Sequence, residues 1–112
     1  MHADYILPGL IVAYLAWRVL SSFLARRRIP ALLQDGAQMV DVRSPAEFAG
    51  GHAPGSVNIP LPELDQRMQE LDRGRWVIVC CASGTRSALA RRKLRGRGFD
   101  RVLNAGSWRV LP

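Results

Sequence analysis

Residues 76–87 read Trp-Val-Ile-Val-Cys-Cys-Ala-Ser-Gly-Thr-Arg-Ser, and this stretch decides the fold of the chain. The apolar run 76–79 is short and bounded by turn residues, which is typical of a strand buried on both faces. Residues 87–95 are rich in strong helix formers, so a helix is predicted to follow. The sequence therefore places a thiol where a buried strand ends and a helix is about to start.

The loop between this strand and helix favours an ionised thiol. Its residues are small and include Gly84, so its backbone N–H groups can turn inward. Such a nest beside a helix N-terminus attracts negative charge, and Arg86 adds a permanent positive charge. A cysteine in this field is expected to have a lowered pKa and to be a thiolate at neutral pH. We predict a reactive thiol or an anion site, against the simpler alternative of a buried cysteine before an ordinary loop.

Two adjacent cysteines allow two ways of counting this loop. From Cys81, glycine is three residues on, arginine five and serine six, and this resembles the active-site loop of rhodaneses, Cys-x-x-Gly-x-Arg-Ser. From Cys80, arginine is six residues on, which resembles the Cys-x5-Arg-Ser loop of tyrosine phosphatases. That family usually has glycine three residues after its cysteine, where Ser83 stands here. The position of the glycine favours Cys81.

The rest of the chain alternates short strands with short helices. Ser44 to Glu47 has the form of a capping box with proline at the first helical position. The predicted strands are 38–43, 56–59, 76–79 and 101–103, and the predicted helices are 31–34, 44–48, 62–71 and 87–95. This alternation predicts an α/β fold with a mainly parallel central sheet flanked by helices. Ligands of such sheets bind outside the carboxyl ends of the strands, where the cysteine loop stands.

A second segment carries the same resemblance. Residues 41–60 include Asp-Val-Arg, Glu-Phe and Gly-His-Ala-Pro-Gly-Ser-Val-Asn-Ile-Pro, which is similar to the rhodanese pattern apart from Ser56 in place of alanine. With the cysteine loop, the resemblance covers about residues 38–103. It implies that Asp41, Arg43, Glu47 and His52 mostly brace the loops beside the active site. A lone histidine is not expected to hold a metal ion, and the chemistry needs no metal or cofactor.

The resemblance implies transfer of a sulfane sulfur in two steps. Cys81 takes the outer sulfur of a donor such as thiosulfate and passes it to cyanide, a cellular thiol or a protein acceptor. Arg86 is expected to supply fixed charge and to tie the loop to the domain. The substrate-binding residues implied are Ala82, Ser83, Gly84, Thr85 and Ser87. Because Ser83 and Thr85 contribute no cation, weak activity on thiosulfate is expected.

Three alternatives come from other classes. One is a phosphatase or arsenate reductase that uses Cys80. Another is a non-catalytic rhodanese-like binding module, against which the retained Cys81, Gly84 and Arg86 argue. The third is a sulfur carrier docked to a membrane partner, which is compatible with sulfur transfer.

The N-terminus predicts a membrane anchor. Residues 5–25 form an apolar run of about the ~20 residues needed to cross a bilayer, and residues 26–28 are three arginines. The positive-inside rule then puts residues 29–112, the rhodanese-like domain, in the cytoplasm, with residues 1–28 as a single-pass anchor in the inner membrane. Arg18 interrupts the run but can snorkel toward the interface. An interfacial helix and a cleaved signal peptide are the alternatives.

Composition adds the compartment and limits the partners. The chain of 112 residues has 16 Lys and Arg against 9 Asp and Glu, a net charge of +7. The two cysteines are neighbours and are expected to be free thiols, which suits a reducing compartment. The basic run over 91–97 is read as a solvated helix face, with anionic lipid as the next partner. Nucleic acid is not expected, because no recognition module accompanies the charge.

Overall fold

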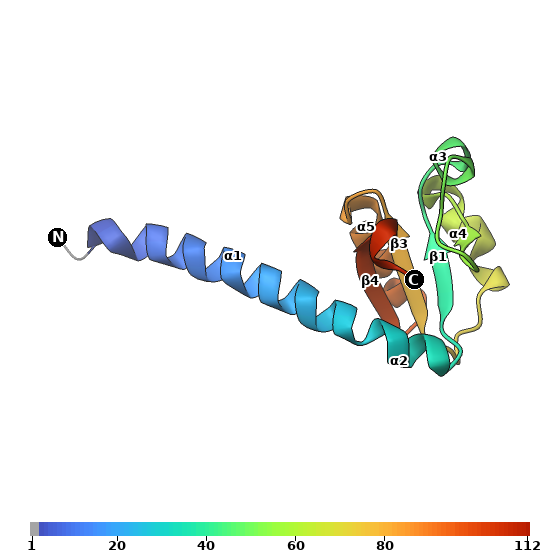
Figure 1. Cartoon of the computed structure of the whole chain (residues 1–112), viewed down its shortest axis with the longest axis horizontal. Coiled ribbons are helices and arrows are strands. Elements are labelled where there is room, and N and C mark those ends of the chain that lie inside the picture. The colour runs from blue at the N-terminus through green and yellow to red at the C-terminus, as the bar shows by residue number, and fades with distance from the viewer. Residues whose placement is uncertain (1–2) are drawn as a thin grey trace.

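The chain folds around a four-stranded parallel sheet, as the sequence predicts. The computed structural model describes residues 3–112, and Figure 1 shows them as one small domain behind a long N-terminal helix. The strands are β1 (Gln38–Asp41), β2 (Val57–Asn58), β3 (Val77–Cys81) and β4 (Val102–Ser107), in the spatial order β2-β1-β3-β4. All three strand pairs are parallel, so the carboxyl ends of the strands meet at one edge.

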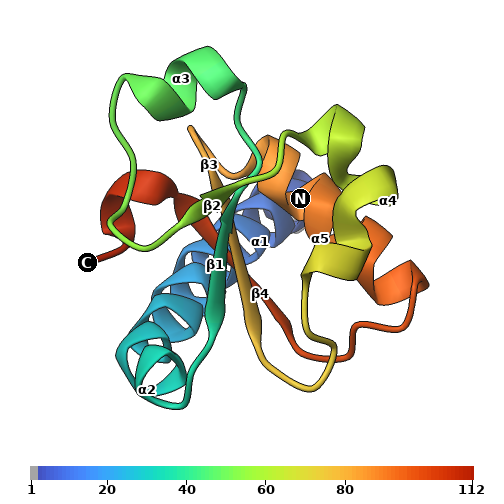
Figure 2. The same ribbon diagram turned by 90° about the vertical axis from the view of Figure 1, so that its right-hand side faces the viewer.

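Helices cover both faces of this sheet. They are α1 (Ala3–Arg27), α2 (Ile29–Gln34), α3 (Pro45–Ala49), α4 (Leu64–Arg67) and α5 (Thr85–Gly96), with 3-10 turns at Leu61–Glu63, Met68–Glu70 and Trp108–Val110. Figure 2 shows α4 and α5 on one side of the sheet and α2 with the end of α1 on the other. The capping box predicted at the start of α3 is present: Ser44 and Glu47 each bond the other's backbone N–H.

Successive residues of β3 point into two separate cores. Val77, Val79 and Cys81 belong to the core beneath α4 and α5, together with Leu94. Ile78 and Cys80 belong to the core on the opposite face, which Ile29 and Leu32 of α2 help to close. This follows from the two-residue period of a strand. The two neighbouring thiols therefore face opposite sides of the sheet.

Several element boundaries differ from those predicted. β3 continues through both cysteines, because both side chains are buried and the backbone stays paired with β4 as far as Cys81. β4 runs to Ser107, two residues beyond an irregularity in the pairing at Ala105. The helix predicted over 62–71 is a single α-helical turn between two 3-10 turns. Its predicted apolar face is nevertheless packed on the core through Leu64 and Met68.

Helix α1 projects from the domain. It has 25 residues, and the molecule measures 56 × 29 × 27 Å as a result. Its large apolar side chains are exposed, from Tyr5 at 79% to Leu24 at 50%, and only its last turns approach the sheet. By length and composition it is apolar enough to cross a membrane, a property that a signal sequence shares.

Candidate active site around Cys81

The sulfur of Cys81 lies inside the turn that links β3 to α5. The side chain is 1% exposed, and the backbone N–H of Gly84 donates to Sγ at 2.9 Å. The hydroxyl of Ser87, in the first turn of α5, lies 3.4 Å from the same sulfur. The helix begins at Thr85, two residues before the predicted start, so its first turn forms part of the cradle.

Gly84 is required by the geometry of this turn. Its φ of +107° lies in the left-handed region, which side chains with a Cβ disfavour. A Cβ on Gly84 would also stand 3.3 Å from the Cα of Gly106, which is backbone and cannot move aside as a side chain can. Because neither residue has a side chain, the cysteine loop can pack closely against the end of β4.

The two thiols have opposite electrostatic surroundings. Burial acts to raise the pKa of Cys81, but hydrogen bonds from the Ser87 side chain and from the N–H groups of Ser87, Gly84 and Ser83 outweigh it, and the pKa is lowered. Burial, with the charge of Asp41 adding to it, raises the pKa of Cys80 to about 12. Only Cys81 is therefore held in surroundings that favour a thiolate.

Asn104 of β4 is a member of this site that sequence reasoning missed. Its Oδ1 accepts from the Ser87 hydroxyl at 2.7 Å and from the N–H of Gly106 at 2.9 Å, and its Nδ2 donates to the carbonyl of Gly84 at 3.3 Å. A hydroxyl carries one hydrogen, so Ser87 donates either to Asn104 or to an ionised Cys81. Nothing local marks Asn104 in the sequence, because its place depends on how β4 pairs with β3.

Arg86 is held by Glu47 from the other half of the chain. Its two terminal nitrogens donate to the two carboxylate oxygens at 2.7 and 3.0 Å. Hydrogen bonding to Arg86, then to the Ser44 backbone, lowers the pKa of Glu47 to about 2. The prediction that Arg86 ties the loop to the domain thus has a defined partner on α3.

A buried ion pair braces α3 in turn. Arg43 bonds Asp41 at 2.8 Å and donates to the backbone carbonyls of Glu47 and Gly51, while its guanidinium lies 4.7 Å from the ring centroid of Trp108. His52 stacks on Phe48, and among residues 3–112 no cluster of metal-ligating side chains occurs.

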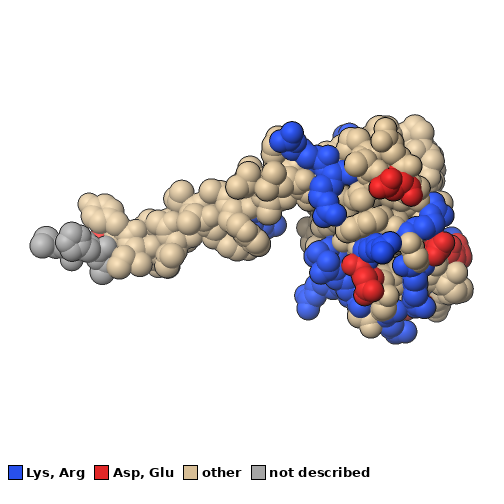
Figure 3. All heavy atoms as spheres, turned by 90° about the horizontal axis from the view of Figure 1, so that it is seen from below, with Lys and Arg blue, Asp and Glu red and all other residues tan. Residues whose placement is uncertain are grey.

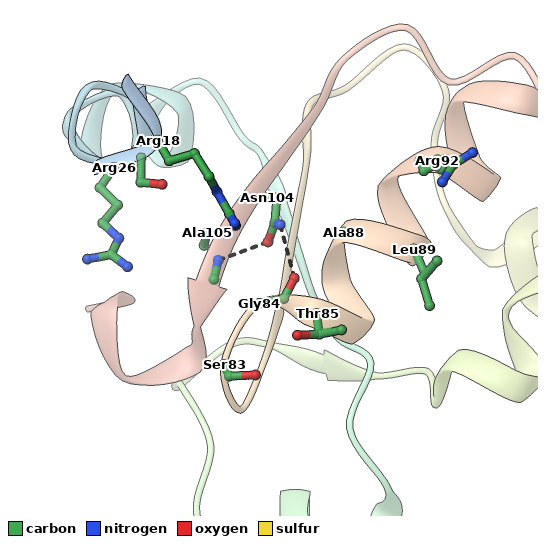
Figure 4. Close-up of a pocket in the computed structure, with 12 residues that line it drawn as sticks. Arg18, Arg26, Ser83, Gly84, Thr85, Ala88, Leu89, Arg92, Asn104 and Ala105 are labelled. Carbon is green, nitrogen blue, oxygen red and sulfur yellow. Dashed lines mark hydrogen bonds between the residues drawn. The ribbon is translucent and has the colours of Figure 1, made fainter. Parts of the chain in front are cut away.

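The mouth of the loop is open. Ala82, Ser83 and Thr85 are exposed, whereas Ser87 is buried. Beside the mouth is a pocket of about 450 Å³ between α1, the loop, α5 and β4 (Figure 4). Its lining includes three arginines that the sequence reading did not connect with the site, Arg18, Arg26 and Arg92.

Comparison with known proteins assigns the family. The family model for the rhodanese-like domain matches residues 27–109. The chain belongs to the rhodanese-like domain family. In this chain Cys81 is the last residue of β3, at the carboxyl edge of the sheet.

Relatives of this rhodanese-like chain include a named sulfurtransferase. The present chain is 43% identical to the uncharacterized protein YqhL of Bacillus subtilis over 68 residues, which make up 61% of the present chain. The present chain is 41% identical to a sulfurtransferase of Allochromatium vinosum over 66 residues, which make up 59% of the present chain. The chain spans 54% and 62% of the lengths of these two relatives.

The fold is also that of solved rhodanese structures. A structure described as a rhodanese with anions from Escherichia coli superposes with a TM-score of 0.65 at 32% identity. The superposition covers 69% of this chain and 95% of that one. These likenesses support sulfur transfer as the general chemistry of the family to which the chain belongs.

Proposed function

We propose that this rhodanese-like protein is a sulfurtransferase that carries a sulfane sulfur as a persulfide on Cys81. The observation that carries the proposal is the cradle: the Gly84 N–H donates to Sγ at 2.9 Å, with Ser87 at 3.4 Å on another side. These bonds hold the pKa of Cys81 below its usual value despite burial. A thiolate is the nucleophile that sulfur chemistry needs.

The first step is attack of the Cys81 thiolate on the outer sulfur of a donor such as thiosulfate. A new S–S bond forms to Cys81, the S–S bond of thiosulfate breaks, and its electron pair leaves with sulfite. The terminal sulfur then carries the negative charge. The inward N–H groups of the loop stabilise this charge as an oxyanion hole stabilises an alkoxide.

The second step returns the enzyme to its starting form. A nucleophile such as cyanide or a thiolate attacks the outer sulfur, and the electron pair of the breaking S–S bond returns to Cys81 as a thiolate. The reaction passes through a covalent intermediate, so donor and acceptor bind in turn with ping-pong kinetics. Ser83 and Thr85, both exposed at the mouth, are the loop side chains that contact the donor.

Steady-state kinetics with single-cysteine variants test the proposal. Purified protein is given thiosulfate and cyanide, and thiocyanate and sulfite are both measured. We expect Cys80→Ser to turn over nearly as wild type and Cys81→Ser to be inactive. Equal activity of the Cys81→Ser variant would rule out a Cys81 intermediate, and hydrolysis of p-nitrophenyl phosphate that depends on Cys80 would favour a phosphatase instead.

We also propose that α1 anchors the enzyme in the inner membrane with the domain in the cytoplasm. The helix is about 37 Å long at 1.5 Å per residue, longer than a hydrocarbon core of about 30 Å. Large apolar residues exposed along its length need a nonpolar environment, and Arg26 to Arg28 at its end favour the cytoplasmic side. A free thiolate also suits the reducing cytoplasm.

A further inference from the structure

The pocket beside the cysteine loop is lined by positive charge. Arg18 and Arg26 enter it from α1, and Arg92 enters it from α5. All three are exposed, and no carboxylate of the described residues lies within ion-pairing distance of them. Figure 3 shows basic side chains gathered where α1 meets the domain. Three arginines without a carboxylate partner in the lining of one hollow make it favourable for an anion.

Hydroxyl groups and the cysteine loop complete the lining. Ser22 of α1 and Ser83 and Thr85 of the loop line the same pocket, so hydrogen-bond donors accompany the charges. Gly84 also lines it, and the same residue donates its N–H to the sulfur of Cys81. Gly84 therefore lies between the basic pocket and the sulfur of Cys81, the candidate nucleophile. Figure 4 shows Arg18 reaching from α1 toward the end of β4 beside the loop.

The size of the pocket suits a small molecule. Its volume of about 450 Å³ falls in the range of roughly 300–1,000 Å³ that is usual for small-molecule sites. The exposed loop positions Ser83 and Thr85 carry no cation, and Arg86 is paired with Glu47, so a charged donor receives little counter-charge from the loop. Arg18 and Arg26 supply that counter-charge from another part of the chain.

We propose that Arg18, Arg26 and Arg92 form an anion-binding site that selects negatively charged sulfur donors and brings them to the Cys81 loop. This assignment rests on the proposed sulfurtransferase function and names its substrate class, a small molecule with a sulfonate-, sulfate- or carboxylate-type group. It also accounts for Arg18, which is costly within an apolar span. Here the guanidinium lines a polar pocket instead of facing lipid alone.

The headgroup of an anionic lipid is the alternative ligand for these arginines. Arg18, Ser22 and Arg26 lie in the part of α1 that meets the domain, so a spanning α1 holds the pocket on the side of the membrane where the domain lies, near the lipid headgroups. The loop residues in the lining favour the donor, because a headgroup bound only for anchoring would need no contact with Ser83 or Thr85. The experiment separates the two ligands.

The binding test uses the full chain with Cys81→Ser, in uncharged detergent, and sulfate as a probe that cannot transfer sulfur. We expect saturable sulfate binding by calorimetry, weakened about tenfold or more by Arg18→Gln and by Arg26→Gln, as loss of one charge-assisted bond predicts. Arg95→Gln is the matched control, since it removes the same charge from an exposed position of α5 outside the pocket lining. Equal sulfate affinity in all variants would overturn the site, whatever the fate of the proposed function.

A kinetic and a lipid measurement complete the design. With Cys81 intact, Arg18→Gln and Arg26→Gln should raise the KM for thiosulfate while leaving kcat nearly unchanged, and added salt should raise the wild-type KM more than theirs. Circular dichroism checks that each variant is folded.

The last measurement compares binding of the variants to vesicles of phosphatidylcholine with and without phosphatidylglycerol. If the arginine variants lose affinity for phosphatidylglycerol but bind sulfate as before, the pocket serves lipid and the donor assignment is wrong.

Discussion

Arg86 and Glu47 are joined by two hydrogen bonds, of 2.7 and 3.0 Å, although 39 residues separate them in sequence. The fork of the guanidinium matches both carboxylate oxygens, and this pair fastens the first turn of α5 to α3. Both terminal nitrogens of Arg86 are engaged in the pair. We therefore expect Arg86 to act on Cys81 mainly by fixing the shape of the loop.

The first prediction separates charge from shape at Arg86. Arg86→Lys keeps the charge but not the fork, so we expect it to slow sulfur loading nearly as much as Arg86→Ala does. Ser87→Ala should raise the pKa of Cys81 toward the usual thiol value, because it removes a hydrogen bond that favours the thiolate. The rate of alkylation against pH measures this pKa. Full activity of Arg86→Lys would show that the charge alone suffices.

The second prediction concerns acid. The pKa of Glu47 is lowered to about 2 in the folded protein, so its ion pair stabilises the fold fully above the unfolded value of about 4.5. This contribution is lost as the pH falls from about 4.5 toward about 2. Urea unfolding of wild type and Glu47→Gln across this range should give a stability difference that shrinks with falling pH. A constant difference would mean that the carboxylate charge is not what stabilises the pair.

The third prediction concerns the two glycines at the loop. Gly84→Ala forces a Cβ into a left-handed residue and within 3.3 Å of Gly106, so we expect a loss of about 1–3 kcal/mol in the free energy of unfolding. Gly96→Ala is the control, since nothing lies within 4 Å of its Cβ position at the end of α5. That variant should be unchanged or up to about 1 kcal/mol more stable. Equal effects at both positions would contradict the packing described.

The fourth prediction concerns the anchor. If α1 spans the membrane, the full-length protein should stay in the membrane fraction after carbonate extraction. A protease added to intact cells should leave the domain uncut, and should digest it after lysis, because the arginines at the end of α1 stay on the cytoplasmic side. Release by carbonate would replace the span by an interfacial helix. A mature protein that lacks α1 would identify a signal peptide.

Much of the fold is readable from local pattern. The run 76–79, the capping box at Ser44 and the apolar positions Leu64 and Met68 each specify an element through neighbours in sequence. The parallel order follows because short strands alternate with helices. The length of β4 was not readable, since its pairing passes an irregularity at Ala105 and ends on glycine and serine, which do not resemble a strand.

The site was readable only in part. The spacing of Cys81, Gly84 and Arg86 marks the loop. The tight turn needs glycine, and the hydrogen-bond donors to the thiolate come from residues a few positions after the cysteine. Asn104 and Arg18 have no such signal. Each reaches the site through tertiary packing, one across the β3–β4 pairing and the other through the docking of α1 against β4. A local sequence pattern cannot predict contacts that depend on how a helix distant in sequence packs against the domain.

The most direct test of a Cys81 persulfide is peptide mass spectrometry after one turnover with thiosulfate and no acceptor. Cys80 and Cys81 are neighbours and fall in the same proteolytic peptide, so the mass gain alone does not show which of them is modified. Cys80→Ser and Cys81→Ser are therefore compared with wild type. We predict a gain of about 32 Da, one sulfur, in wild type and Cys80→Ser, and its removal by cyanide. Cys81→Ser should gain nothing. A gain in Cys81→Ser with none in Cys80→Ser would contradict the account, because the reactive thiol would then lie on the opposite face of β3.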